Sequence, residues 1–147
     1  MNNTPRGWPR ISPSLFYDDA AGAIDWLCKA FGFEVRLRIE GENGRIEHSE
    51  LTFGEGMIMV GQSGTDALPA FRARGRSPKA VDGVYTQSLC VFVDEVDSHC
   101  ARARAAGAVI YAEPEVHDYG PDYWTDRSYG AADPEGHHWW FTQRVRG

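Results

Sequence analysis

The chain has 147 residues, of which 42% are hydrophobic and 24% are charged, and its formal net charge is −6 at pH 7. This length and balance fit one folded, soluble domain with its own core and argue against a disordered chain. No segment holds the roughly 20 apolar residues of a membrane span, no apolar stretch follows the N-terminal charges as in a signal peptide, and no basic stripe offers a path for nucleic acid. We therefore expect a cytoplasmic protein with no membrane or nucleic-acid partner.

The first predicted elements are a strand, an amphipathic helix and a second strand over residues 11–35. An apolar stripe with the spacing of one helix face is formed by Ile24, Leu27, Cys28 and Phe31. Asp18 or Asp19 is placed to cap the start of this helix, and Gly32 is placed to end it. Three strands joined by hairpin turns are predicted over residues 34–40, 45–53 and 57–62. Together these elements make one βαβββ module over about residues 10–62.

The segment 63–86 is rich in glycine, proline, serine and charge, which predicts a linker. Its basic residues are Arg72, Arg74, Arg76 and Lys79. The neighbouring Gly75, Ser77 and Pro78 favour a solvated loop. The alternative is that the basic residues hold an anionic group of a ligand.

The same order of strand, helix, glycine and strand returns over residues 88–110. Asp94 is the expected N-cap of this second helix, and Gly107 is its expected end. Further strands are predicted over residues 109–113, 127–132 and 137–143, joined by a long aromatic loop and by the turn 133–136. We expect an α+β fold in a single domain, residues 1–147, with a second βαβββ module over about residues 87–143.

One segment carries a specific resemblance: residues 126–141 read Asp-Arg-Ser-Tyr-Gly-Ala-Ala-Asp-Pro-Glu-Gly-His-His-Trp-Trp-Phe. With the two βαβββ units, this closing signature resembles the vicinal oxygen chelate superfamily of glyoxalases, bleomycin-resistance proteins and dioxygenases. The segment 46–51, Ile-Glu-His-Ser-Glu-Leu, is similar to the branch described as glyoxalase/bleomycin resistance proteins. The resemblance implies an open, curled, eight-stranded mixed sheet around a ligand cleft, with helices outside, usually completed in a homodimer.

The metal enzymes of that superfamily place one metal ligand on each of four strands. The matching positions in this sequence are Ser12, Ser88, Met59 or Val60, and Trp140. A hydroxyl, a thioether and an indole do not replace the imidazole and carboxylate ligands that divalent cations need. We therefore expect no metal and no other cofactor.

His48 and Glu50 lie two residues apart in a predicted strand, so their side chains share one face and form a candidate catalytic acid/base pair. On a concave face the pair would lie in the cleft; on a convex face it would be solvated or covered by a helix. Arg127 has two interpretations, an anchor for an anionic ligand group or a partner of Asp133 or Glu135. The candidate ligand-binding residues are Met59, Tyr111, Trp124, Arg127, Tyr129 and Trp140.

These residues favour a metal-free protein that binds or sequesters a small aromatic or heterocyclic molecule in an aromatic cleft. The alternative is an enzyme of the same superfamily, a lyase or isomerase or a dioxygenase-like protein. Such an enzyme would use His48 and Glu50 as acid and base, or a divalent metal at displaced ligands. The expected partners are a small-molecule ligand and a second copy of the chain.

Overall fold

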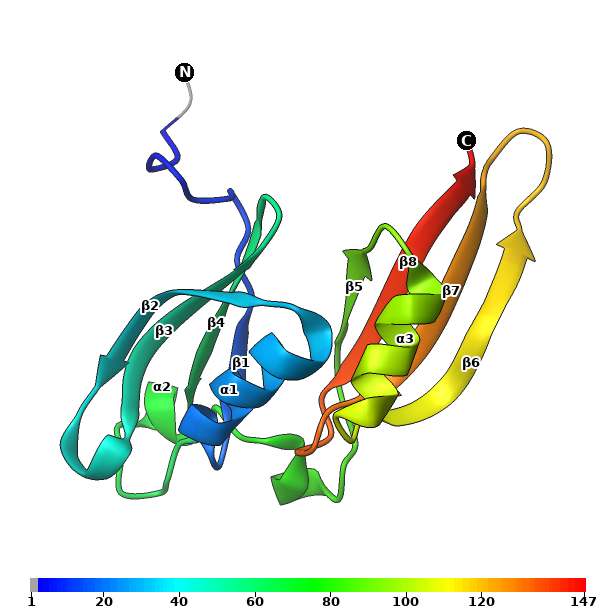
Figure 1. Ribbon diagram of the computed structural model, residues 1–147. Coiled ribbons are helices and arrows are strands. Elements are labelled where there is room, and N and C mark those ends of the chain that lie inside the picture. The colour runs from blue at the N-terminus through cyan, green and yellow to red at the C-terminus, as the bar shows by residue number, and fades with distance from the viewer. Residues whose placement is uncertain (1–2) are drawn as a thin grey trace. The chain divides into compact units, whose positions relative to one another are not determined.

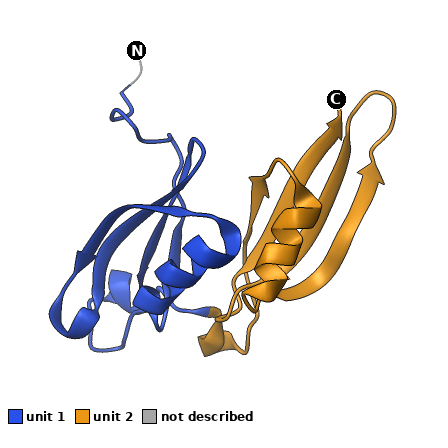
Figure 2. Ribbon diagram, in the orientation of Figure 1, with its two compact units in different colours: residues 1–77 blue, residues 78–147 orange. Residues whose placement is uncertain are grey.

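The computed structural model describes residues 3–147 (Figure 1). The chain forms two compact units, residues 1–77 and residues 78–147 (Figure 2). Each unit holds one four-stranded sheet, and the strands of each sheet pair only with one another. Within residues 3–147, no helix is long and apolar enough to cross a bilayer.

The first unit is a βαβββ module. Its strands are β1 (Ser14–Tyr17), β2 (Glu34–Glu40), β3 (Ile46–Phe53) and β4 (Gly56–Gln62), and its long helix is α1 (Ala20–Phe31). The strand order is β1-β4-β3-β2, with β1 parallel to β4 and the other pairs antiparallel. A short helix α2 (Ala70–Ala73) follows β4 in the loop that leads out of the sheet.

Helix α1 begins and ends where the sequence predicts. The carboxylate of Asp19 accepts a hydrogen bond of 3.0 Å from the amide of Gly22, which satisfies a free donor of the first turn. Gly32 has φ 87°, a left-handed conformation that glycine adopts without strain, and it ends the helix. Ile24 and Leu27 of the apolar stripe are fully buried, so the stripe packs on the sheet.

The second unit repeats the module. Its elements are β5 (Ser88–Phe92), α3 (Val96–Ala105), β6 (Val109–Asp118), β7 (Thr125–Ala132) and β8 (His138–Arg146). The order β5-β8-β7-β6, with β5 parallel to β8, matches that of the first sheet. The expected α+β fold of two βαβββ modules is therefore confirmed, and its eight strands are shared between two sheets of four.

The start of α3 differs from the prediction. The N-cap residue is Glu95 rather than Asp94, and its side chain makes no capping hydrogen bond. The amide of Val96 instead donates to the side-chain oxygen of Gln143, on β8, at 3.0 Å. Gln143, which is far away in sequence, thus accepts the hydrogen bond that an N-cap side chain would otherwise accept. The residues next to the helix do not predict this partner.

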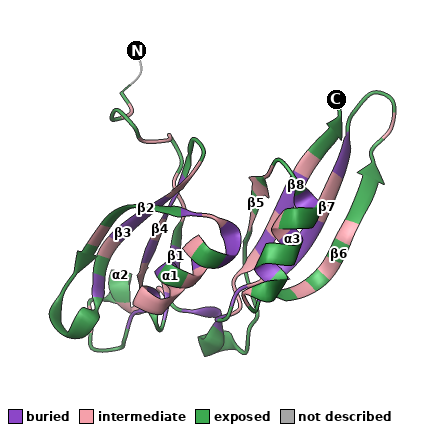
Figure 3. Ribbon diagram, viewed as in Figure 1, coloured by how far each residue is buried: buried purple, intermediate pink, exposed green. Residues whose placement is uncertain are grey.

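The turn between β7 and β8 is organised by Asp133, which is buried. Its carboxylate accepts hydrogen bonds of 3.0–3.1 Å from the amides of Glu135, Gly136 and His137. It also accepts one of 3.2 Å from the indole nitrogen of Trp139. Trp139 is fully buried, and its ring stacks on Phe141, which contacts His99 of α3. Figure 3 shows buried positions of β7 and β8 along α3.

Candidate functional site

His48 and Glu50 project from the face of the first sheet that is turned away from α1. Arg38, on β2, pairs with Asp25 of α1 at 2.9 Å, so Arg38 marks the helix side of the sheet. Ser49 is the cross-strand partner of Arg38 and shares that side. Because neighbouring residues of a strand alternate, His48 and Glu50 point to the opposite side.

The two side chains form the predicted pair. Nε2 of His48 donates a hydrogen bond of 3.1 Å to Oε1 of Glu50. The Glu50 side chain is only 7% exposed, whereas that of His48 is 39% exposed. Met59 lies directly opposite Glu50 on β4, so this candidate ligand-binding residue shares the face with the pair.

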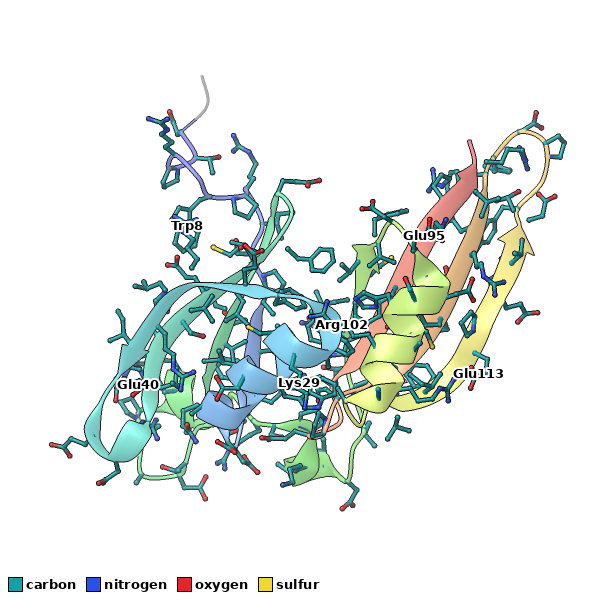
Figure 4. The ribbon with its side chains drawn as sticks, in the orientation of Figure 1. Trp8, Lys29, Glu40, Glu95, Arg102 and Glu113 are labelled. Carbon is teal, nitrogen blue, oxygen red and sulfur yellow. The ribbon has the colours of Figure 1, made fainter. Side chains whose placement is uncertain are left out.

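A third charged residue on this face is Arg36, which the sequence pattern does not single out. A break in the β2–β3 register between Val35 and Leu37 marks a bulge, which re-aims the side chain of Arg36. Its Nε lies 3.3 Å from Oε2 of Glu50, and its guanidinium also donates to the carbonyl oxygen of Gly7. The ring of Trp8, labelled in Figure 4, lies 5.4 Å from the guanidinium carbon.

The arrangement can support proton transfer. Arg36 and His48 both contact the carboxylate of Glu50. When His48 is a neutral imidazole that donates its Nε2–H to Glu50, its Nδ1 carries no proton and can accept one. The half-exposed His48 is therefore the group of this pair that a solute can reach.

The corresponding face of the second sheet carries aromatic side chains. Trp139 is fully buried on the side of α3, and Trp140, next in the strand, points to the other side. We use the term aromatic cluster for four residues on that face: Tyr85, Tyr111, His138 and Trp140.

The rings of the aromatic cluster are in contact. His138 lies between two tyrosines, with ring centroids 3.7 Å from Tyr85 and 4.6 Å from Tyr111. Tyr111 meets Trp140 edge to face at 5.7 Å. Tyr85 and Tyr111 remain 45% and 40% exposed, so the cluster presents ring surface to solvent. Gly130, on β7, leaves room for the Tyr111 ring, which a β-carbon there would approach to 2.5 Å.

Burial favours the uncharged forms of His138 and Tyr111 in the aromatic cluster. Burial has the largest effect on His138 and lowers its pKa. The charge of Asp133 opposes this shift, and His137 adds a smaller effect in the same direction as burial. Burial also raises the pKa of Tyr111 to about 12. The Nδ1 atom of His138 is buried and has no hydrogen-bond partner among the described residues.

Two predicted ligand-binding residues lie on the other side of this sheet. Tyr129 is fully buried, and its hydroxyl is 2.6 Å from Nδ1 of His99, a residue of α3. Arg127 forms a two-pronged ion pair with Asp97 of the same helix, at 2.7 and 3.0 Å, rather than with Asp133 or Glu135. Tyr129 and Arg127 therefore lie on the α3 side of the sheet, opposite the aromatic cluster.

Trp124 lies apart from the aromatic cluster, in the β6–β7 turn, and is half-exposed. Its ring is 5.0 Å from the guanidinium of Arg144, which also lies over Phe92 at 5.4 Å. Arg144 pairs with the carboxylate of Asp126 at 2.6 Å. The sequence pattern pointed to Arg127 and not to Arg144. Arg144 nevertheless lies four residues after Trp140 in one strand and so shares its side.

The donor set does not fit a divalent metal. The positions matched to metal ligands hold Ser12, Ser88, Met59 or Val60, and Trp140, none of which supplies imidazole or carboxylate. Within residues 3–147, no group of three or more histidine, cysteine, aspartate and glutamate side chains is arranged to hold a metal ion.

The chain is similar to several known proteins. Residues 10–141 match the family described as Glyoxalase/Bleomycin resistance protein/Dioxygenase superfamily. An uncharacterized protein of Mycobacterium bovis is 33% identical over 139 residues, which cover 94% of this chain and 85% of that protein. One of Mycobacterium tuberculosis shows the same identity, with 76% of its length covered.

Two solved structures share the fold. TioX from Micromonospora sp. ML1 matches with a TM-score of 0.70 and 31% identity, over 93% of this chain and 99% of TioX. A glyoxalase/bleomycin resistance protein/dioxygenase family enzyme from Burkholderia phytofirmans matches with a TM-score of 0.63 and 19% identity, over 91% and 97% of the two chains. The second likeness concerns the fold alone.

Proposed function

Since this chain belongs to the Glyoxalase/Bleomycin resistance protein/Dioxygenase superfamily, we propose that it binds a small planar aromatic or heterocyclic molecule on the aromatic cluster of its second unit. The observation that carries the proposal is the set of four contacting rings on the sheet face away from α3. Stacking and edge contacts with such rings need no metal.

The electrostatics of the cluster support an uncharged ring system as the bound part of the ligand. His138 and Tyr111 are neutral at pH 7, and the rings offer apolar faces with polar edges. Each aromatic pair contributes about 0.5–1.5 kcal/mol beyond the area it buries, so two or three pairs contribute about 1–4.5 kcal/mol, to which the burial of apolar surface adds.

The test uses the neutral dye N-phenyl-1-naphthylamine, whose fluorescence rises in apolar sites, followed by a screen of aromatic natural products. Trp140→Leu removes one ring of the cluster and should weaken dye binding by about tenfold or more, a loss of about 1.4 kcal/mol. Trp26→Leu, on α1 of the first unit, is the matched control and should change the dissociation constant less than twofold. Equal effects of the two substitutions, or no binding by wild type, would contradict the proposal.

A second candidate function is acid/base catalysis by His48, favoured by its hydrogen bond to a glutamate that Arg36 also holds. A lyase or isomerase step would begin with removal of a proton from the substrate by Nδ1 of His48. Any turnover found in the compound screen should then be lost in His48→Ala and kept in Trp140→Leu. Turnover that survives in His48→Ala would refute this role.

Metal dependence and assembly are tested separately. Stoichiometric divalent metal in protein purified without chelators would contradict the metal-free proposal.

We also propose a homodimer, because the edge strand β2 exposes Val35, Leu37 and Ile39, apolar side chains that a partner surface would cover. Analytical ultracentrifugation showing only monomer at micromolar concentration would refute the dimer.

A further inference from the structure

The loop that leaves the first sheet is folded on itself. The amide of Gly64 donates to the carbonyl oxygen of Gly75 at 2.7 Å and closes the loop at its base. Helix α2 lies between these two glycines (Figure 1). The loop borders a cavity of about 600 Å³, within the range of sites for small organic ligands. The cavity is lined by Asp66, Leu68, Ala70, Ala73, Arg74 and Arg76.

The charge of this loop is positive although the whole chain is acidic. Residues 63–77 contain three arginines and one aspartate. Arg76 donates to the carboxylate of Asp66 at 2.7 Å and to the carbonyl oxygen of Ala73 at 2.6 Å. Arg72 lies over the ring of Phe71 at 5.6 Å and does not line the cavity.

Arg74 is the arginine of the lining whose side chain makes no hydrogen bond or ion pair with any described residue. A guanidinium binds a carboxylate or a phosphate through two parallel N–H···O bonds, a geometry that the side chain offers to a solute when no protein group occupies it. Arg76 has its own anionic partner, Asp66, which competes with any bound anion. Leu68, Ala70 and Ala73 supply an apolar wall beside these charges.

We propose that this loop cavity binds a small organic oxyanion, a carboxylate or a phosphate monoester, through Arg74 and Arg76, with the apolar body of the ligand against Leu68 and Ala70. The site belongs to the first unit and is independent of the aromatic cluster. It gives a role to the basic stretch of the linker that the proposed function leaves unused.

Titrations followed by the backbone amide signals of the full chain test the proposal, with benzoate and phenyl phosphate as the two oxyanion probes. The amides of Gly64 and Gly75 should shift saturably with one or both probes, and the stronger of them identifies the anion. Neutral benzamide and inorganic phosphate should each bind about tenfold more weakly, since each lacks one half of the recognition. Benzamide that binds as well as benzoate, or phosphate that binds as well as phenyl phosphate, would overturn the proposal.

Three exposed substitutions separate a site from general attraction to positive charge. Arg74→Gln should weaken the stronger probe by about tenfold or more, because a charge-assisted bond is lost. Arg72→Gln removes the same charge from the same loop and should leave the affinity within twofold. Asp66→Asn should tighten binding severalfold by freeing Arg76. Equal losses in the two arginine variants, or weaker binding in Asp66→Asn, would show nonspecific attraction and refute the site.

Discussion

Gly130→Ala should remove the ligand surface of the second unit while leaving the fold intact. A β-carbon at Gly130 would lie 2.5 Å from Cε2 and 2.7 Å from Cζ of Tyr111. Carbon atoms in contact prefer about 3.5–4.0 Å, so the ring of Tyr111 must move by about 1 Å. It is free to move outward because it is 40% exposed. That movement separates it from His138 and Trp140, which it now meets at 4.6 and 5.7 Å.

The change in stability should be small because two effects of similar size oppose each other. Replacing glycine by alanine inside a strand contributes about 0.5–1 kcal/mol of stability. Loss of the Tyr111 ring contacts costs about 0.5–1.5 kcal/mol. The free energy of unfolding should therefore change by less than about 1 kcal/mol. The affinity for N-phenyl-1-naphthylamine should fall by about tenfold, since one wall of the aromatic cluster is displaced.

Urea unfolding and the dye titration measure the two quantities on the same protein. Gly61→Ala, in β4 of the first sheet, is the matched control, because a β-carbon there meets the ring of Phe16 at an ordinary 3.9 Å. It should gain about 0.5–1 kcal/mol of stability and keep full dye affinity. Unchanged dye affinity in Gly130→Ala, or a loss of stability above about 3 kcal/mol, would refute the reasoning.

Two further predictions concern the second unit. Asp133→Ala should lower the free energy of unfolding by about 3 kcal/mol, because three amides and the indole of Trp139 lose a charged acceptor; urea unfolding that shows a loss below about 1 kcal/mol would contradict it. The second prediction rests on His138, whose lowered pKa means that the unfolded chain binds its proton first. Stability should therefore fall as pH drops below about 6.5, with a slope of at most about 1.4 kcal/mol per pH unit from this group. His138→Phe should reduce that slope, and parallel slopes in urea unfolding series at several pH values would refute the assignment.

Local signals account for the parts of the fold that were predicted. The stripe of Ile24 and Leu27, the cap of Asp19 and the left-handed Gly32 are features within one helix and its ends, and all are present in α1. The cap of α3 was predicted wrongly because Val96 bonds to Gln143, which the fold brings in from β8. A tertiary partner of this kind leaves no signal near the helix.

The candidate site was predictable up to the choice of sheet face. Alternation alone shows that Tyr129 and Arg127 share one side of their strand, and both do. It does not say which side meets the helix, and the hydroxyl of Tyr129 on His99 settles that. Arg36 was not predicted for another reason. The bulge in β2 changes the direction of its side chain and breaks the in–out alternation of side chains on which the prediction depended.

The parallel pairing of the first and last strands has a consequence for how each module folds. Ser14 of β1 pairs with Met59 of β4, so the pairing of these two strands closes a long loop of the chain. The β3–β4 hairpin pairs two strands that follow one another in the sequence. Loop closure costs more entropy than hairpin formation, so we expect the hairpins to form first and β1 to dock last. Because β1–β4 of the first sheet all lie at or before Gln62, this sequence of events needs no strand of the second sheet.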